Sequence, residues 1–471
     1  MWRSDEGVAP YIGLSNIKQS CQNPPTNPNL KHQGACMSLP THIQQTYTAI
    51  LREELVPAMG CTEPIAIAYA ASILRHALGA DPAALRVELS GNIIKNVKSV
   101  IVPATDGMHG IEAAVAAGIV AGCPDRKLEV LCALKPADAQ RIRDFLAATT
   151  PAVSELDTKH PFELVMTGEA TVNSQTVTAR VHLIDRHTNV VSVSRTAEGE
   201  DQDLTDRYLY GESQEHTQPA DRSLLNVQDI VTFAEEVDLD EVKPLLTRQI
   251  SMNMAIAEEG LRNEYGASIG RLLYNGGHSD LRTQARAYAA AGSDARMNGC
   301  ELPVCIISGS GNQGMTASVP VVVYARKWHT DEETLLRALL VSNLITVHQK
   351  TGIGCLSAYC GAISAGCGCG CGICYLAGGR FNEIAHTLVN AVAILSGTIC
   401  DGAKASCAAK IAMAVEAGIM GYDMMRSGRQ FYGGDGIITK GVENTIRNIG
   451  RLARDGMSET DREIIRIMLG E

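Results

Sequence analysis

Residues 352–379 read GIGCLSAYCGAISAGCGCGCGICYLAGG, which is the composition of a tightly packed helical core. The stretch holds six cysteines and nine glycines, and no charged residue lies between Lys350 and Arg380. An uncharged run of this length raises the question of a membrane span. Its many glycines and its polar serine and tyrosine residues fit a buried pair of helical segments better. We therefore predict packed helices here and no membrane-spanning segment.

The composition of the whole chain also favours helices. Hydrophobic residues make up 45% of the 471 residues but aromatic residues only 4%, so the interior is built from Ala, Val, Ile and Leu, which suits close-packed helices. The length allows two or three domains, or one large core that carries a smaller insertion. The expected fold class is α+β, a predominantly helical core with a small inserted α/β subdomain.

Changes in composition and in the pattern of apolar residues divide the chain into four segments. Residues 1–40 mix Pro, Asn, Gln and Gly without apolar periodicity, which predicts a disordered leader. Residues 41–125 read as the first part of the helical core, and residues 231–471 as its helical, Ala/Gly-rich remainder. Between them, residues 126–230 contain alternating runs such as TVTARVHLI and are expected to form the inserted α/β subdomain.

Charge and the N-terminal sequence narrow the partners and the compartment. The formal net charge is −11 and no cluster of Lys and Arg occurs, which argues against nucleic acid and against a membrane surface. The expected partner is a small molecule. The N-terminus has acidic residues where an export signal needs basic ones, so we expect a cytoplasmic protein whose fifteen cysteines stay reduced.

The sequence GSGNQG at residues 309–314 matches the dinucleotide-binding pattern G-x-G-x-x-G. The following MTASVPVVVYA contains Pro320 and a β-branched run where a nucleotide-binding helix would have its second turn. We therefore favour a glycine-rich turn that binds a small anion such as a carboxylate. Its backbone N–H groups and the side chains of Ser308, Ser310 and Asn312 would make the contacts.

Two cysteines have the spacing of ligands at a helix junction. On one unbroken helix, Cys400 and Cys407 would lie about 10 Å apart, too far for one compact cluster. A break at Asp401-Gly402, with one helix ending near Cys400 and Asp401 capping the next, would let the two thiols converge on an iron–sulfur cluster. Only one cysteine of residues 352–379 can easily reach such a cluster. Geometry alone leaves open which one, and the others are expected to be core residues.

Cys61 lies in MGCTEPIA, immediately before a predicted helix that Thr62 would cap and Gly79 would close. A helix N-terminus stabilises a thiolate, so the pKa of Cys61 is expected to fall and the residue could act as a base or a nucleophile. The alternative interpretation is an inert buried cysteine.

Five motifs in order resemble the L-cysteine desulfidase family, which is related to the alpha chain of iron–sulfur L-serine dehydratases. The motifs are GCTEP at 60–64, SGNIIKNV at 90–97, SGSGNQGMTASVP at 308–320, LSAYCGA at 356–362 and CDGAKASCAAK at 400–410. The resemblance extends over residues 43–455. It implies a [4Fe–4S] cluster held by Cys360, Cys400 and Cys407, and a proton-abstracting role for Cys61.

The same resemblance implies a lyase that degrades L-cysteine to pyruvate, ammonia and hydrogen sulfide. The alternatives are an L-serine dehydratase with the same kind of cluster, a pyridoxal phosphate lyase, and a non-enzymatic iron–sulfur sensor. Expected substrate contacts, beside the serines and Asn312 of the turn at 308–314, are Thr62, Glu63, Asn92 and Lys95. A homodimer is also expected. The additional thiols at Cys355 and Cys367–Cys374 depart from the family pattern, and one of them could block the fourth iron.

Overall fold

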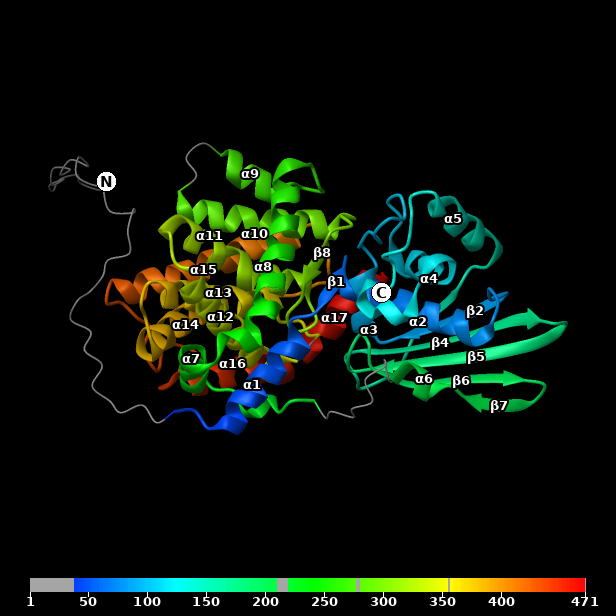
Figure 1. The fold of residues 1–471 in the computed structure, drawn as a ribbon, viewed down its shortest axis with the longest axis horizontal. Coiled ribbons are helices and arrows are strands. Elements are labelled where there is room, and N and C mark those ends of the chain that lie inside the picture. The colour runs from blue at the N-terminus through cyan, green and yellow to red at the C-terminus, as the bar shows by residue number, and fades with distance from the viewer. Residues whose placement is uncertain (1–37, 210–218, 277–279, 355, 471) are drawn as a thin grey trace, which may run out of the picture.

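The structure is a computed structural model that describes residues 38–209, 219–276, 280–354 and 356–470. It confirms the predicted α+β class, because helices dominate and a single six-stranded sheet accompanies them. Figure 1 shows a helical part on one side and a part containing the six-stranded sheet on the other, with the C-terminal helix α17 (Ser458–Leu469) near their junction. The expected leader lies outside the described residues except for 38–40.

The helical part is a bundle of packed helices with one small two-stranded sheet. Its helices are α1 (Thr41–Glu54), α7 (Val227–Glu236), α8 (Leu239–Arg262), α9 (Ile269–Asn275), α10 (Leu281–Met297), α11 (Gly311–Trp328), α12 (Glu332–Ile353), α13 (Gly361–Leu376), α14 (Phe381–Leu395), α15 (Cys407–Arg426), α16 (Val442–Arg451) and the π-helical turn η3 (Leu452–Gly456). Strands β1 (Pro57–Met59) and β8 (Pro303–Cys305) pair antiparallel beside them.

Helix α13, the glycine-rich stretch of the sequence, lies at the centre and packs against α11, α12, α14 and α15. Its glycines form two rows with i, i+4 spacing. Gly366 and Gly370 face the backbone of α15, and Gly368 and Gly372 face α12. A Cβ atom on Gly366 would lie 2.3 Å from the carbonyl oxygen of Ala414. The glycines therefore allow neighbouring helices to approach to backbone contact.

The other part is a twisted mixed sheet with helices on one face. The strand order is β3-β2-β4-β5-β6-β7, with β2 and β3 parallel and the other pairs antiparallel. Its elements are β2 (Ala84–Leu89), β3 (Ala152–Glu155), β4 (Glu163–Val172), β5 (Gln175–Ile184), β6 (Val190–Ala197), β7 (Glu200–Asp203), α2 (Thr62–Leu78), α3 (Gly91–Val97), α4 (Gly110–Ala121), η1 (Pro124–Glu129), α5 (Asp138–Ala148) and α6 (Thr205–Leu209), followed by η2 (Arg222–Leu224).

The alternating pattern of the strands decides which face is covered. Along β5, the buried residues Val177, Ala179, Val181 and Leu183 alternate with more exposed ones. Helix α2, nearly all of it buried, packs against β4, β5 and β6, and α4 packs on α2. The sheet includes β2, which precedes residue 126 in the chain. The same helix α2 that covers the sheet also begins immediately after Cys61, next to the helical part.

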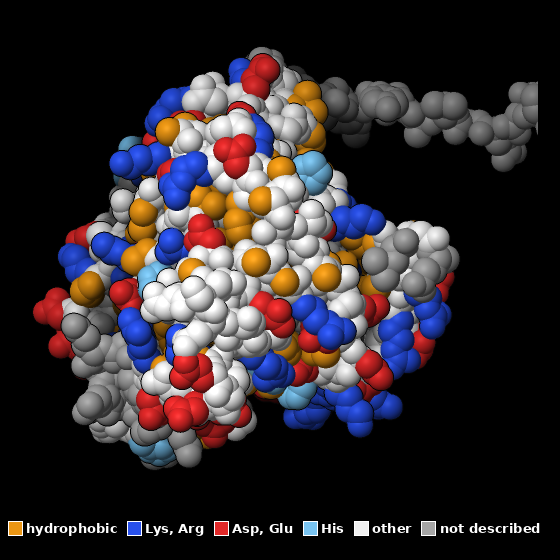
Figure 2. All heavy atoms as spheres, turned by 90° about the vertical axis from the view of Figure 1, so that its right-hand side faces the viewer, with side chains coloured by type: hydrophobic (Ala, Val, Ile, Leu, Met, Phe, Trp, Pro, Cys, Tyr) orange, Lys and Arg blue, Asp and Glu red, His pale blue; other side chains and the backbone are white. Residues whose placement is uncertain are grey.

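Side chains of both charges lie on the face of the molecule that Figure 2 shows. None of the helices in the described ranges combines the length and apolar character needed to cross a bilayer. In Figure 2, Lys and Arg side chains are interspersed with Asp and Glu across the end of the molecule that carries the sheet.

Candidate functional site

A small cavity of about 90 Å³ lies where the two parts meet. It is lined by the start of α2, the turn before α11, the loops that lead into α13 and α15, and one residue from the turn between β5 and β6. Since a buried water occupies roughly 10–15 Å³ on a comparable measure, the cavity has room for several waters or one small organic molecule. Four of the expected functional cysteines, Cys61, Cys360, Cys400 and Cys407, line it together.

Cys61 reaches the cavity because β1 ends in a tight turn. Gly60 has a φ of +58°, and a Cβ atom there would lie 2.5 Å from Cγ of Pro103, so only glycine fits. The chain then enters α2 with Cys61 itself at the N-cap position and Thr62 as the first helical residue, so the helix begins one position earlier than expected. Helix α2 ends at Gly79 in the left-handed conformation, as predicted.

The Cys61 thiol donates a hydrogen bond to Glu63 Oε2 at 3.1 Å. Burial, together with the neighbouring Glu63 carboxylate, raises the pKa of Cys61 well above its ordinary value. The expectation that the helix N-terminus lowers this pKa is therefore wrong. The helix contributes only a partial positive charge, whereas the thiol is 2% exposed and lies beside a full negative charge.

Glu63 is the charged partner of Cys61. Burial would raise its pKa, but His187 and the hydrogen bond from Cys61 outweigh burial and lower the pKa to about 2. Thr62 Oγ1 lies 2.8 Å from the Gly309 carbonyl oxygen and 3.0 Å from Glu63 Oε2. Thr62 thus ties the start of α2 to the glycine-rich turn, while Glu63 lines the cavity.

His187 is a cavity residue that sequence reasoning missed. It lies in the turn between β5 and β6, and its Nε2 is 3.8 Å from Glu63 Oε1. The ring packs edge-on against Phe162 with the ring centroids 4.9 Å apart, and Nε2 is buried without a hydrogen-bond partner. The surrounding DRHTN sequence is that of an ordinary polar turn, so no local signal marks the histidine as functional.

The three expected cluster ligands come from two adjacent loops. Tyr359 and Ile399 form an isolated antiparallel bridge. Beside it, the Cys360 N–H donates to the Thr398 carbonyl at 3.0 Å, and the Cys400 N–H donates to the Ala358 carbonyl at 2.6 Å. This pairing places Cys360, at the N-cap position of α13, next to Cys400.

The predicted helix break between Cys400 and Cys407 is confirmed, although its details differ. Helix α14 ends at Leu395, before Cys400, and α15 begins at Cys407. Asp401 does not cap α15, because it forms ion pairs with Lys404 and Lys410. Its charge is therefore balanced by the two lysines that flank Cys407.

The electrostatics of the three thiols favour a negative charge on one of them. The hydrogen bond that Cys360 donates to Cys400 raises the pKa of Cys360 and lowers that of Cys400, and the positive charge of Lys95 lowers the latter further. Burial raises the pKa of Cys407. In the described part of the chain, no three His, Cys, Asp or Glu side chains are positioned to hold a single metal ion.

The other thiols of the glycine-rich stretch face the core. Cys367, Cys369, Cys371 and Cys374 are at most 1% exposed, none lines the cavity, and burial raises the pKa of each. Cys355 lies outside the described residues. The described thiols of this group therefore contact helices, as the interpretation of core residues predicts.

The glycine-rich turn opens into the cavity through Ser308, Ser310 and Asn312. Ser310 caps α11, with its Oγ accepting from the Gln313 N–H at 3.5 Å. The sequence argument that Pro320 prevents a helix here is wrong, because α11 continues through it to Trp328. Packing in the core outweighs the local cost of a helical proline, which is about 3 kcal/mol.

A dinucleotide-binding fold is nevertheless absent from this region. Strand β8, which precedes the turn, pairs only with β1, and the two are antiparallel. A dinucleotide fold requires a parallel sheet at this point. The turn lines the cavity instead, and its binding of a small anion stays a prediction.

Asn92 and Lys95 lie behind the cavity and do not line it. Asn92 Nδ2 donates to Asp461 Oδ2 of α17 at 2.8 Å, and Lys95 forms a buried ion pair with the other oxygen of the same carboxylate. Their neighbour Asn96 lines the cavity. The structure thus assigns Asn92 and Lys95 contacts that hold α17 against α3.

Comparisons with known proteins show the family of the chain. The family model of the serine dehydratase alpha chain matches residues 125–466. A UPF0597 protein of Desulfitobacterium hafniense is 53% identical over 430 residues, covering 91% of this chain and 97% of the relative. A UPF0597 protein of Treponema denticola is 45% identical over 438 residues, covering 92% and 100%. The chain therefore belongs to the serine dehydratase alpha chain family.

Proposed function

We propose that the protein is an iron–sulfur-dependent lyase that degrades L-cysteine to pyruvate, ammonia and hydrogen sulfide. The observation that supports this most directly is the cavity itself. It brings the Cys61–Glu63 pair, a candidate proton acceptor, together with the thiols of Cys360, Cys400 and Cys407 in a space of small-molecule size.

The three thiols suit a [4Fe–4S] cluster by their chemistry. Such clusters are normally held by four thiolates, so three leave one iron open. Cys360 and Cys400 interact directly, and the lowered pKa of Cys400 favours the thiolate that binds iron. When bound, the cluster would supply a Lewis-acidic iron that assists departure of the β-substituent.

The residues of this chain would carry the proton. The proton of Cys61 lies on the hydrogen bond to Glu63 Oε2. The positive charge of a bound substrate ammonium group beside Cys61 would stabilise the Cys61 thiolate, with Glu63 Oε2 as the acceptor of its proton. The thiolate then takes the Cα proton of the substrate, acting as a general base.

The remaining steps follow from the electron pair left on Cα. The pair forms a Cα=Cβ double bond, the Cβ–S bond breaks, and sulfide leaves with the bonding electrons and takes up a proton. The 2-aminoacrylate that remains tautomerises and adds one water to give pyruvate and ammonia. The overall reaction consumes one water per L-cysteine and needs no oxidant or reductant.

A second candidate reaction is the dehydration of L-serine by the same steps, with hydroxide in place of sulfide. It is favoured by the description of the matching family, the serine dehydratase alpha chain. L-Cysteine is favoured by the resemblance of the motifs at 60–64, 90–97, 308–320, 356–362 and 400–410.

The first experiment is to purify the protein without oxygen and measure pyruvate and sulfide released from L-cysteine, with L-serine in parallel, before and after exposure to air. Turnover of L-cysteine that air abolishes supports the proposal. Preference for L-serine by more than tenfold in kcat/KM would favour the second candidate. No turnover of either amino acid by iron-loaded protein would contradict both.

The ligand assignment needs a measurement of bound iron. We expect Ala substitutions of Cys360, Cys400 or Cys407 to lower iron and acid-labile sulfide strongly. The matched control is Cys367→Ala, which removes a buried thiol that does not line the cavity and should leave iron unchanged. An equal loss in the control would indicate the sensor alternative, in which all cysteines matter alike.

Cys61→Ser should keep iron and lose turnover about 10²–10⁴-fold.

A further inference from the structure

Arg296 is a buried cation that faces the cavity without an acidic partner. It lies near the end of α10, is 2% exposed and lines the cavity. Its Nε donates to the Gly60 carbonyl at 2.9 Å, while its Nη2 is buried with no hydrogen-bond partner. Among the described residues, no carboxylate lies within ion-pairing distance of this guanidinium.

A buried and unpaired guanidinium is costly, since a charge removed from water requires a partner. Two half-buried arginines of the chain illustrate the usual solution, which is pairing with a carboxylate. Arg286, ten residues earlier on α10, pairs with Glu416 at 3.3 Å, and Arg222 pairs with Glu53 and Glu54. Arg296 differs from both because it lines the cavity and has no carboxylate partner among the described residues, so an anionic ligand is the natural partner.

The turn at 308–312 is built around the same guanidinium. A Cβ atom on Gly311 would lie 2.5 Å from Arg296 Nε and 2.9 Å from Cζ, so glycine leaves the space that the guanidinium fills. Asn312 Oδ1 and Gln313 Oε1, next in the chain, are buried acceptors without partners, and both residues line the cavity. One unpaired donor and two unpaired acceptors thus lie around one small space.

We propose that Arg296 binds the α-carboxylate of the substrate, and that Asn312 and Gln313 accept hydrogen bonds from its α-ammonium group. The identity of the substrate as an amino acid rests on the proposed function. A guanidinium presents paired N–H donors that match a carboxylate, and the amide oxygens match an ammonium group. The site would therefore select free, zwitterionic α-amino acids. It would reject their amides and esters, and peptides in which the amino acid is the first residue, because these lack the free α-carboxylate.

The test uses two probes that lack a leaving group on Cβ and so undergo no elimination. Binding of L-alanine and of L-alaninamide to the anaerobically purified wild-type protein is measured by calorimetry. We expect L-alanine to bind at least tenfold more tightly, because only it carries the carboxylate. Equal binding of the two probes would overturn the proposal without any substitution.

Substitutions locate the contact. Arg296→Gln should weaken L-alanine binding at least tenfold and raise KM for the amino acid substrate, and Arg296→Lys should lose less because it keeps the charge. The matched control is Arg286→Gln on the same helix, outside the cavity, which should bind L-alanine as the wild type does. Folding is checked by circular dichroism, and bound iron is measured for each variant.

The outcomes separate this proposal from the proposed function. If Arg296→Gln is folded and binds L-alanine as tightly as the wild type, Arg296 is not the carboxylate contact, even where the lyase activity is present. If the wild type binds L-alanine through Arg296 but turns over neither L-cysteine nor L-serine, the binding site stands and the proposed reaction fails.

Discussion

Glu63 keeps a negative charge in a position where burial alone would favour the neutral acid. It is 7% exposed, yet its pKa is lowered to about 2 because His187 and the Cys61 thiol outweigh the desolvation. An ionised carboxylate beside a thiol of raised pKa holds the proton on sulfur until a further positive charge stabilises the thiolate. This arrangement gives Glu63, and not the helix N-terminus, the main control over Cys61.

Substitution of Glu63 should therefore reduce turnover at every pH. We expect Glu63→Gln to lower kcat about 10²-fold or more by removing the acceptor of the Cys61 proton. Because the pKa of Glu63 in the folded protein is about 2, the wild-type profile of kcat/KM should show no acidic inflection from this group near pH 4–5. An inflection there that Glu63→Gln removes would contradict the assignment.

The lowered pKa of Glu63 also makes the stability of the folded protein depend on pH. An unfolded glutamate has a pKa of about 4.3, so ionised Glu63 contributes stability above that pH. The contribution is lost as the pH falls from about 4 towards the folded value near 2. Glu63→Asp, which keeps the charge but shortens the side chain, is the control and should retain part of the activity.

At the scale of elements, the backbone contact of α13 with α15 positions the thiol of Cys360. Gly366 and Gly370 on α13 meet Ala414 and Gly418 on α15 at backbone distance. Any side chain at these positions forces the helices apart, and Cys360 and Cys407 stand at the first turns of the two helices. The glycines of residues 352–379 thus set the distance between Cys360 and Cys407, two of the expected cluster ligands.

Gly366→Ala tests this contact. Its Cβ atom would lie 2.3 Å from the Ala414 carbonyl oxygen, and overpacking of this kind typically costs about 1–3 kcal/mol. We expect a lower urea midpoint and less bound iron. Gly276→Ala, where a Cβ atom would make only ordinary contacts at 3.4 Å and beyond, is the control and should change neither quantity.

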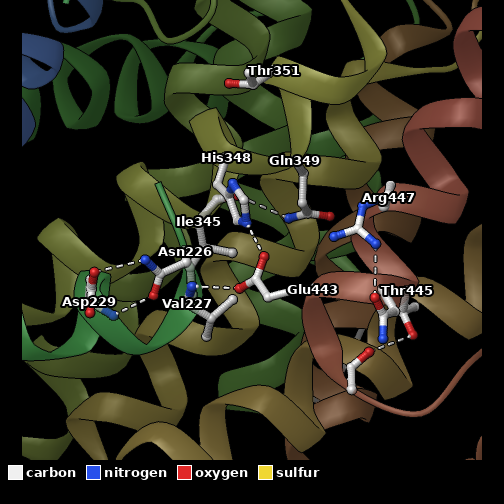
Figure 3. Close-up of polar contacts among 12 residues, drawn as sticks. Asn226, Val227, Asp229, Ile345, His348, Gln349, Thr351, Glu443, Thr445 and Arg447 are labelled. Carbon is white, nitrogen blue, oxygen red and sulfur yellow. Dashed lines mark hydrogen bonds and ion pairs between the residues drawn. The ribbon is translucent and has the colours of Figure 1, made fainter. Parts of the chain in front are cut away.

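Helix α12 is held at its other side by a hydrogen bond to α16, as Figure 3 shows. His348 Nε2 lies 2.7 Å from Glu443 Oε2, and Glu443 Oε1 accepts from the Val227 N–H at the start of α7 at 2.8 Å. Burial raises the pKa of Glu443, but these two hydrogen bonds outweigh it and lower the pKa below its ordinary value. One carboxylate therefore joins three helices.

Glu443→Gln should destabilise the protein at neutral pH by about 1–2 kcal/mol, the loss of a charged hydrogen bond. Because the folded pKa is depressed, the contribution exists above the unfolded pKa of about 4.3 and disappears as the pH falls below it. The difference in urea midpoint between variant and wild type should therefore shrink from pH 7 to pH 4. Glu333→Gln, in an exposed pair with Arg337, is the control for a surface charge. A difference that does not depend on pH would contradict this account.

At the scale of the whole molecule, the cavity is complete only when the sheet part and the helical part meet. The thiol of Cys61 comes from the helix that covers the sheet, His187 comes from a turn of the sheet, and Cys360 and Cys407 come from the helical part. His187 also lines a larger neighbouring cavity of about 620 Å³. The histidine therefore lies between the small cavity and this larger space.

His187→Ala should change catalysis and leave the fold intact. Without the imidazole, the pKa of Glu63 rises, because the largest interaction that lowers it is lost. We expect kcat to fall about tenfold and an acidic inflection to appear in the kcat/KM profile. His160→Ala removes an exposed histidine of the same part that pairs with Asp185 and should change neither. A profile of His187→Ala with the wild-type shape would contradict the role of His187.

Local patterns predicted much of this architecture. The glycine-rich stretch predicted packed helices because small residues at helical spacing allow close approach, and the alternation of TVTARVHLI predicted a strand. The break between Cys400 and Cys407 followed from the length of a helical turn. Pro320 was misread, since its helix is stabilised by the surrounding core and not by its own sequence.

The sequence by itself therefore predicted the elements, because periodicity and glycine spacing act over short distances along the chain, and the resemblance of its motifs singled out Cys61 and Cys360. Only the tertiary structure decided that His187 and Arg296 face the cavity, and that Asn92 and Lys95 bind Asp461 instead. The pKa values of Cys61 and Glu63 were decided in the same way. The physical reason is that burial and charge–charge contacts depend on which residues distant in the chain become neighbours in space.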